Sequence, residues 1–186
     1  MSEGIRVLLI EDHELVRGAF QAILDKESDI QVMGSVESAE EALGLLSGQE
    51  PPHVITLDLV LGRGMSGHEA ALRILAERPG VRILVVSQRM DAGELSTLLR
   101  AGVHGFLSKR TAVGEFVRAV RTVASGQLYF CPESTVALAQ VVARPADSEL
   151  LTTRETEILL RTTRGMTTAE IAKDLCLSPK TVEKHR

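Results

Sequence analysis

The sequence is poor in cysteine and has neither a long apolar run nor an export signal. Only two cysteines occur among 186 residues, and Cys131 and Cys176 lie far apart, without a CxxC or histidine spacing typical of metal sites. They are interpreted as small core residues in a reducing compartment rather than a disulfide or a metal pair. No apolar run reaches the length of about eighteen residues that a membrane-spanning helix needs. The N-terminus lacks a basic segment followed by an apolar one and a cleavage site, so a cytoplasmic protein is expected.

The composition indicates a folded chain of one large or two small domains. Hydrophobic residues make up 44% and charged residues 25%, so a buried core is expected and disorder is not. The formal net charge of −4 alone argues against nucleic-acid binding. Basic residues are nevertheless in excess over residues 150–186, where Lys180, Lys184 and Arg186 lie close together. This local excess permits a DNA-binding segment there.

Residues 1–125 alternate between short apolar runs and amphipathic stretches. In the first amphipathic stretch, Leu15, Ala19 and Ile23 fall on one helical stripe. The apolar runs are rich in β-branched residues, as in strands buried on both faces, and occupy residues 5–10, 30–36, 53–57, 81–86 and 105–107. Five strand–helix repeats predict an α/β fold, a doubly wound five-stranded parallel sheet covered by helices on both faces.

The remaining sequence is interpreted as a linker over 126–150 and a small all-α region over 151–186. The linker combines a short helical pattern with Pro132, Pro145 and acidic residues. Three short helices are expected after it. Their starts are marked by two capping boxes and by a serine N-cap followed by proline, at Thr152-x-x-Glu155, Thr167-x-x-Glu170 and Ser178-Pro179.

Polar side chains stand where the predicted strands end. Glu11 and Asp12 follow the first strand, Asp58 follows the third, Ser87 follows the fourth, and Lys109 comes after the fifth. A parallel sheet brings such ends to one edge, and the functional crevice lies beyond that edge at the topological switch point. We therefore expect three carboxylates, one hydroxyl and one ammonium to meet there.

Closely packed carboxylates favour a divalent cation, and oxygen ligands with few protein donors suit Mg²⁺. Asp58 could then attack a phosphorus atom, while Lys109 and Ser87 neutralise oxygens of the transferred group. Simpler interpretations exist for single residues, because Asp12 could cap a helix that begins at His13 and a lone lysine is usually solvated. All five residues at the correct strand ends favour the phosphoacceptor interpretation.

Residues 4–125 resemble the receiver domain of two-component response regulators. The resemblance rests on Glu11-Asp12, Asp58, Ser87 and Lys109. It implies a flavodoxin-like (CheY-like) fold, phosphorylation by a sensor histidine kinase or a small phosphodonor, and Mg²⁺ held by Glu11, Asp12, Asp58 and the backbone carbonyl of Val60. It also implies a switch in which Ser87 moves toward the phosphate and Phe106 turns inward. Phe106 is equally well interpreted as a plain core residue.

The loop after Asp58 departs from the family pattern. Leu61 and Gly62 stand where the family often has Met-Pro, and the glycine expected further on is Gly67, one residue later than usual. A loop one residue longer is therefore predicted, so its path over the metal site does not follow from the family pattern.

The end of the sequence has the features of a helix-turn-helix. Ile171, Ala172 and Leu175 form an apolar stripe, and Val182 in the following helix is expected to pack back against it. The outward face of that helix suits DNA phosphates and base edges; it carries Lys180, Thr181, Lys184 and His185.

Four motifs in this region resemble the LuxR-type DNA-binding domain; they are Leu151-Thr-Thr-Arg-Glu155, Gly165-Met-Thr167, Glu170-Ile-Ala172 and Leu177-Ser-Pro-Lys-Thr-Val182. With the receiver, they indicate the NarL/FixJ class of response regulators. Residues 105–110 and 119–126 more narrowly resemble the regulator of hexose-phosphate uptake. Because the sequence ends at Arg186 within the recognition helix, an incomplete domain with weak DNA binding is expected. Glu183 also occupies a position that is often basic in this family.

The predicted function is a phosphorylation-dependent, DNA-binding transcription regulator rather than an enzyme. Its expected partners are a sensor histidine kinase, promoter DNA and, on phosphorylation, a second copy of the chain. One alternative is a hydrolase or phosphotransferase that uses Asp58 and Mg²⁺ on an external substrate; Val60 argues against it, because an acid/base carboxylate would be needed there. The other alternative is an interaction protein that never receives phosphate, which the intact acidic residues and Lys109 disfavour.

Overall fold

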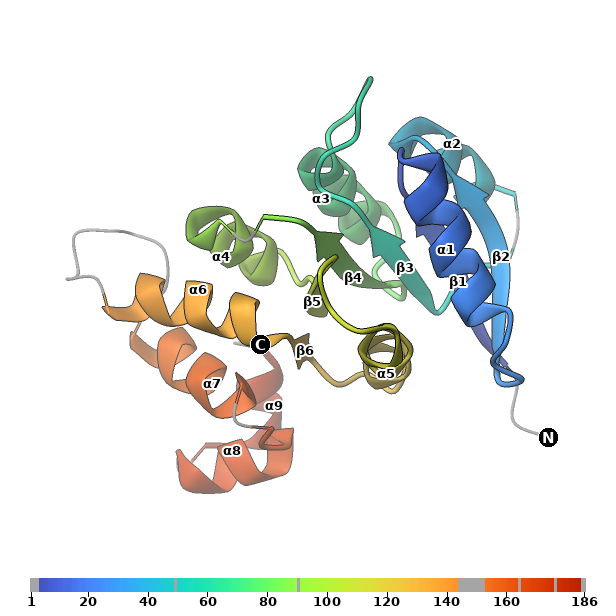
Figure 1. Ribbon diagram of the computed structural model, residues 1–186. Helices are drawn as coiled ribbons and strands as arrows, with labels where there is room; N and C mark the ends of the chain where they lie inside the picture. Colours follow the sequence, from blue (N-terminus) through green and yellow to red (C-terminus); the bar gives the residue numbers. More distant parts are fainter. Residues whose placement is uncertain are drawn as a thin grey trace.

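The computed structural model describes residues 4–48, 50–89, 91–143, 153–163, 165–175 and 177–184. Its body is a parallel sheet with the strand order β2-β1-β3-β4-β5-β6 (Figure 1). The strands are β1 (Ile5–Ile10), β2 (Ile30–Val36), β3 (Val54–Leu57), β4 (Arg82–Ser87), β5 (Gly105–Ser108) and β6 (Tyr129–Phe130). The predicted doubly wound α/β fold is confirmed, with all five expected strands present and a sixth added to the edge of the sheet.

Helices cover both faces of this sheet. On one face lie α1 (Glu14–Leu24) and α5 (Val113–Ala124), and on the other lie α2 (Ala39–Leu46), α3 (Gly67–Glu77) and α4 (Ala92–Arg100) (Figure 1). Successive side chains of a strand point to opposite faces. Accordingly, Val7 and Leu9 join the core under α1 and α5, whereas Leu8 and Ile10 join the core under the other helices.

The segment predicted as a linker is part of this body over residues 127–143. Strand β6 pairs in parallel with β5, and the following helix α6 (Pro132–Ala143) packs against α4. Leu138 is buried in the main core, and Phe130 stacks on Phe106 with ring centroids 5.9 Å apart. Cys131 is a free, buried thiol, which confirms its interpretation as a core residue; Cys176 lies outside the described residues.

Three short helices follow, as expected for the all-α region: α7 (Thr153–Thr163), α8 (Thr168–Asp174) and α9 (Pro179–Lys184). The capping box of α8 is confirmed, because Thr167 and Glu170 exchange side-chain and backbone hydrogen bonds. At α9 the amide of Thr181 donates to Ser178 Oγ at 3.0 Å. The predicted box at Thr152 lies outside the described residues.

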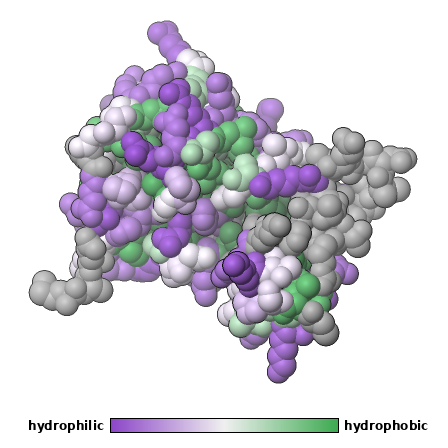
Figure 2. All heavy atoms as spheres, turned by 180° about the vertical axis from the view of Figure 1, so that it is seen from behind, coloured by the Kyte–Doolittle hydropathy of each residue, from purple (hydrophilic) through white to green (hydrophobic). Residues whose placement is uncertain are grey.

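The C-terminal helices have a small core of their own. Ile158, Ile171, Ala172 and Val182 are buried together, so Val182 packs back on the α8 stripe as predicted. Leu159 faces the other way and joins the core of the main body. In Figure 2, hydrophilic side chains cover much of the visible face, with smaller apolar areas between them. Among the described residues, no helix is long and apolar enough to cross a membrane.

Candidate functional site

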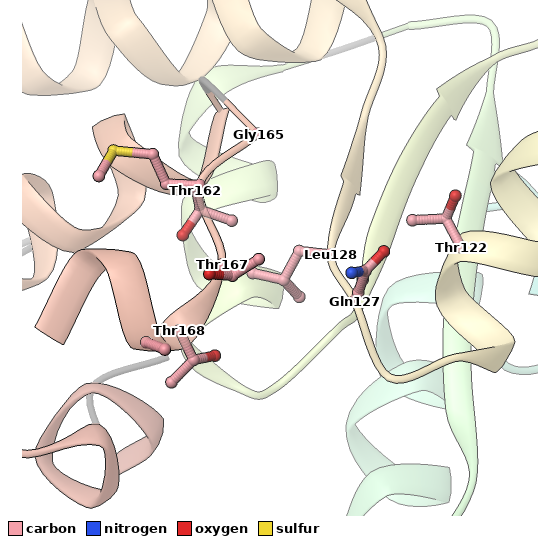
Figure 3. A pocket seen from close by; sticks show the side chains of 9 residues that line it. Thr122, Gln127, Leu128, Thr162, Gly165, Thr167 and Thr168 are labelled. Carbon is pink, nitrogen blue, oxygen red and sulfur yellow. The ribbon is translucent and has the colours of Figure 1, made fainter.

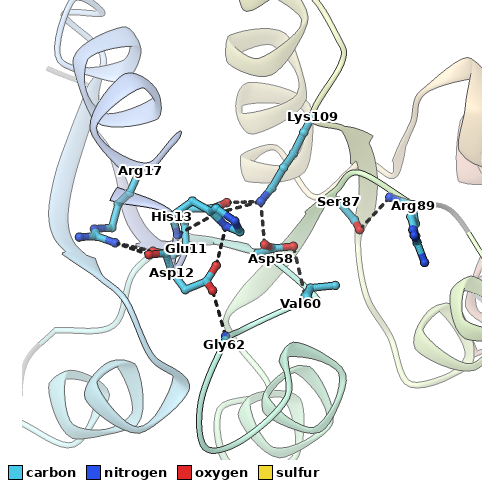
Figure 4. A network of polar contacts seen from close by, with 10 residues as sticks. All are labelled: Glu11, Asp12, His13, Arg17, Asp58, Val60, Gly62, Ser87, Arg89 and Lys109. Carbon is cyan, nitrogen blue, oxygen red and sulfur yellow. Dashed lines mark hydrogen bonds and ion pairs between the residues drawn. The ribbon is translucent and has the colours of Figure 1, made fainter. Parts of the chain in front are cut away.

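Three carboxylates meet at the carboxyl ends of β1 and β3 (Figure 4). The chain leaves β1 toward β2 and then crosses to β3 on the other side of β1, which makes this edge the topological switch point of the sheet. Glu11 and Asp12 follow β1, and Asp58 follows β3, its amide donating to the Ile10 carbonyl at 3.0 Å. One oxygen of each carboxylate and a ring nitrogen of His13 all lie within 4.8 Å of one another. The sheet thus brings these carboxylates together as predicted.

Lys109 supplies a buried cation to two of these carboxylates. Its Nζ lies 2.6 Å from Asp58 Oδ2 and 2.6 Å from Glu11 Oε2, with only 6% of the lysine side chain exposed. Burial by itself would lower the pKa of Lys109, but the hydrogen bonds to Asp58 and Glu11 outweigh burial and raise it. The ammonium therefore stays charged and compensates the buried negative charge.

The two oxygens of Asp12 have different surroundings. Oδ2 accepts a hydrogen bond from the amide of Gly62 at 2.9 Å. Oδ1 is enclosed and accepts no hydrogen bond from the residues that the structure describes, although His13 Nδ1 lies 2.8 Å from it. Asp12 does not cap helix α1, as one interpretation of the sequence allowed, because the N-cap residue of α1 is His13. An enclosed carboxylate oxygen without a donor is costly, and a cation would satisfy it. Together with the three carboxylates, this atom fits the cluster to a divalent cation such as Mg²⁺.

The loop after Asp58 is held at several points. The amide of Val60 donates to Asp58 Oδ1 at 3.2 Å, and Val60 itself is exposed. Further along, the amide of Met65 donates to Glu40 Oε1 at 2.8 Å, and this bond lowers the pKa of Glu40. With the Gly62–Asp12 hydrogen bond, these contacts fix the path that the sequence left open.

Gly67 brings the start of α3 against the phosphoacceptor candidate. Its amide donates to the Leu59 carbonyl at 3.1 Å, and a Cβ placed on it would lie 1.9 Å from the carbonyl oxygen of Asp58. No side chain fits at that distance, so the glycine is required for this close approach.

Ser87 and Phe106 occupy the β4 and β5 side of the site. Ser87 ends β4 and is buried, and its Oγ accepts a hydrogen bond from the amide of Arg89 at 3.3 Å (Figure 4). Phe106 is fully buried and already points inward, where Phe130 stacks on it. The Ser87 hydroxyl is thus on the same edge of the sheet as the carboxylates, but its hydrogen bond is to the loop that follows β4.

Two residues that the sequence reasoning did not assign also belong to this site. Arg17 Nη1 donates to the carbonyl of Glu11 at 2.7 Å and lies 3.4 Å from that of Asp12, so it fixes the turn that carries both carboxylates. The position of Arg17 in the sequence, one helical turn after His13, could have indicated this role. The structure shows that turn, because the His13 carbonyl accepts the Arg17 amide. His13 directs its Nδ1 at the carboxylates.

The residues predicted to contact DNA lie on or after α9. Lys180 is exposed. Thr181 is half-buried, and its hydroxyl lies 2.7 Å from Ser178 Oγ at the helix start. Lys184 is the last residue of α9, and His185 lies outside the described residues.

A cavity of about 400 Å³ lies between the sheet body and the C-terminal helices (Figure 3). Thr122, Gln127 and Leu128 line it from the body, and Thr162 and residues 165–169 line it from the α7–α8 side. The turn between α7 and α8 therefore faces the turn between α5 and β6.

Comparison with known families identifies both halves of the chain. The family model described as the response regulator receiver domain matches residues 7–121, and the model described as bacterial regulatory proteins, luxR family, matches residues 149–186. The chain belongs to the response regulators of the NarL/FixJ class, DNA-binding transcription regulators of two-component systems with a receiver and a LuxR-type helix-turn-helix.

Relatives cover nearly the whole chain. Response regulator GacA of Pseudomonas protegens is 34% identical over 185 residues, which are 98% of this chain and 86% of the relative. Response regulator protein VraR of Staphylococcus aureus is 34% identical over 182 residues, or 97% and 86% of the two chains. The solved RcsB response regulator of Salmonella typhimurium shares the fold, with a TM-score of 0.70 at 22% identity over 99% of this chain and 89% of that one. The narrower resemblance to the regulator of hexose-phosphate uptake stays a prediction.

Proposed function

We propose that Asp58 accepts a phosphoryl group from a sensor histidine kinase or a small phosphodonor, and that this modification gates DNA binding. The receiver unit would span 4–125, the connecting segment 126–150 and the DNA-binding unit 151–186. The observation that carries the proposal is the buried contact of 2.6 Å between Asp58 and Lys109, made inside the acidic cluster at the switch point of the sheet.

In the proposed step, a carboxylate oxygen of Asp58 forms a bond to phosphorus while the bond from phosphorus to the donor atom breaks. The donor leaves with that electron pair. Mg²⁺, which Glu11, Asp12, Asp58 and the Val60 carbonyl would hold, supplies positive charge for the phosphoryl oxygens.

Two side chains of this site can serve the new phosphoryl group. Lys109 already lies beside the Asp58 carboxylate and can pair with a phosphoryl oxygen. Ser87 Oγ, which accepts the amide of Arg89, would donate its hydroxyl hydrogen to a phosphoryl oxygen. The Lys109 contact would then link β5 to β3 in place of the Lys109–Asp58 pair, and the Ser87 contact would link β4 to β3.

The proposed role is that of a regulator rather than a hydrolase. Val60, two residues after Asp58, is apolar and exposed, so this position offers no general acid or base to speed release of the phosphoryl group. A long-lived phosphoaspartate is suited to signalling, whereas a hydrolase must release phosphate rapidly.

Contacts of β5 offer a route from the phosphoacceptor to the DNA-binding helices. The Phe106 carbonyl accepts the amide of Cys131 at 3.1 Å and the hydroxyl of Ser134 at 3.4 Å. These bonds tie β5 to the start of α6, and α6 in turn contacts α7. A shift of β5 when Lys109 changes partner would therefore alter how α7 to α9 are seated.

The proposed output is binding to promoter DNA in the cytoplasm, with a homodimer formed on phosphorylation. Lys180, Thr181, Lys184 and His185 would face phosphates and base edges. The contact between the two halves runs through α6, α7 and the cavity walls, while Lys180 stays exposed. A solved structure of the response regulator RcsB, which shares the fold, is a complex with DNA, and this supports the proposed output.

Intact mass spectrometry after incubation with a small acyl phosphate and Mg²⁺ tests the proposal. The chain should gain one phosphoryl group, Asp58→Asn should gain none, and Asp25→Asn, which changes an exposed carboxylate of α1's end, should behave like the parent. Labelling retained in Asp58→Asn would reject the phosphoacceptor. Rapid release of phosphate in place of a stable adduct would favour the hydrolase.

A further inference from the structure

His13 lies in the acidic cluster, yet the proposed phosphoryl transfer gives it no role. It stands at the N-cap of α1, and its side chain makes no capping hydrogen bond in the described part of the chain. Its side chain is 60% exposed, but Nδ1 points inward, 3.2 Å from Glu11 Oε1 and 2.8 Å from Asp12 Oδ1 (Figure 4).

A hydrogen bond accounts for at most one of these two contacts, because Nδ1 is hydrogen-bonded to Glu11 Oε1 at 3.2 Å and also lies 2.8 Å from Asp12 Oδ1. Nδ1 of an imidazole carries at most one hydrogen, and the nearer oxygen, Asp12 Oδ1, accepts no hydrogen bond from the described residues. Glu11 Oε1 already receives the His13 amide at 3.2 Å and Lys109 Nζ at 2.8 Å. A single hydrogen on Nδ1 leaves one of the two carboxylate oxygens without a donor from the imidazole, whereas one cation beside Nδ1 would compensate both oxygens.

The contact distances suit atoms that share one cation. Donor atoms in adjacent positions around an octahedral ion, each about 2.1 Å from it, lie about 3 Å apart. Nδ1 lies 2.8 Å and 3.2 Å from the two carboxylate oxygens, and it belongs to the set of ligand atoms within 4.8 Å that also includes Asp58.

We propose that His13 Nδ1 is a ligand of the cation at this site, and that it shifts the preference of the site from Mg²⁺ toward Mn²⁺. The inference rests on the proposed metal site of Glu11, Asp12 and Asp58. Mg²⁺ takes oxygen ligands and retains its waters, whereas imidazole nitrogen suits first-row transition ions. His13 is thus a specificity-determining residue for the cation.

Pulsed electron paramagnetic resonance of the full chain loaded with Mn²⁺ tests the ligand directly. The parent protein should show coupling of the Mn²⁺ electron spin to an imidazole ¹⁴N nucleus, and His13→Ala should lose it. His68→Ala is the matched control, because His68 Nδ1 also lies near a carboxylate, 3.7 Å from that of Glu94, and is outside the cluster. The control should keep the coupling.

Competition between Mn²⁺ and Mg²⁺, followed by calorimetry, tests the preference. The ratio of the Mn²⁺ to the Mg²⁺ association constant should fall on the order of tenfold in His13→Ala, as for other changes around a metal, and stay unchanged in His68→Ala. If Mn²⁺ binds without nitrogen coupling, and His13→Ala leaves the ratio of the Mn²⁺ to the Mg²⁺ association constant unchanged, the role of His13 is overturned but the metal site is not. Absence of Mn²⁺ and Mg²⁺ binding by the parent, or binding that Asp12→Asn does not weaken, would overturn the metal site itself.

Discussion

The ammonium of Lys109 and the carboxylate of Asp58 lie 2.6 Å apart, across 51 residues of sequence, and both side chains are almost fully buried. The pair joins the ends of β5 and β3, which are separated in the sheet by β4. Because Glu11 shares the same ammonium, removal of the lysine leaves two buried carboxylates without a counter-charge.

Lys109→Met should therefore destabilise the fold. Loss of one partner of a buried pair costs about 3 kcal/mol, and urea titration of the free energy of unfolding measures it. The exposed Lys26 provides the control, and Lys26→Met should change stability by less than about 0.5 kcal/mol. Equal stabilities of the two variants would show that Lys109 does not compensate buried charge.

Gly67→Ala should disturb both stability and phosphorylation. The added Cβ would meet the Asp58 carbonyl oxygen at 1.9 Å, an overlap that costs about 3 kcal/mol or more and moves the backbone of the phosphoacceptor. Gly18→Ala in α1 meets nothing within 4 Å, and it should stabilise its helix by up to about 1 kcal/mol. Urea titration and acyl-phosphate labelling of both variants check this pair. A Gly67→Ala chain with parental stability and labelling would contradict the close approach.

The hydrogen bond of Tyr129 to Glu115 should make the attachment of β6 dependent on pH. Tyr129 Oη donates to Glu115 Oε2 at 2.5 Å. This bond lowers the pKa of Glu115; burial and then the same carboxylate raise the pKa of Tyr129.

Proton linkage sets the pH range over which this hydrogen bond stabilises the fold. A lowered carboxyl pKa gives stability that is present above about pH 4.3 and is lost as pH falls through the folded-state value. A raised phenol pKa gives stability that is lost as pH rises above about 10. The difference in unfolding free energy between the parent and Tyr129→Phe should thus be largest between these limits and shrink on both sides. A difference that is constant from acid to alkaline pH would contradict the coupling.

Leu138→Ala tests whether α6 belongs to the main core. Leu138 is 1% exposed, whereas Val136 of the same helix is 59% exposed. Truncation of a buried leucine costs about 2–5 kcal/mol, so Leu138→Ala should lower the free energy of unfolding of the receiver by that amount. Val136→Ala should leave it nearly unchanged. If the two substitutions cost the same, α6 is not packed as described.

The sequence predicts the edge of the sheet that holds the site because β-strand periodicity is local. Once the strands over residues 5–10 and 53–57 are recognised, Glu11 and Asp58 must lie at neighbouring carboxyl ends. The capping box of Thr167 and Glu170 is readable for the same reason, since both partners lie within one helical turn.

Contacts between distant segments leave no such signature. Asp12 accepts the Gly62 amide 50 residues away, and Glu40 accepts that of Met65 25 residues away; neither bond has a local pattern. Strand β6 has two residues, too few to show an alternation of apolar and polar side chains, so the sequence predicts a linker there.

The position of β6 determines where the receiver can be separated from the rest of the chain. A fragment that stops at residue 125 would expose the backbone amides and carbonyls along the outer side of β5, since β6 supplies their partners. Open strand edges of this kind recruit other chains and promote aggregation. A fragment that continues through residue 143 keeps β5 paired and Phe106 covered, so the proposed receiver unit over 4–125 should be prepared with β6 and α6 attached.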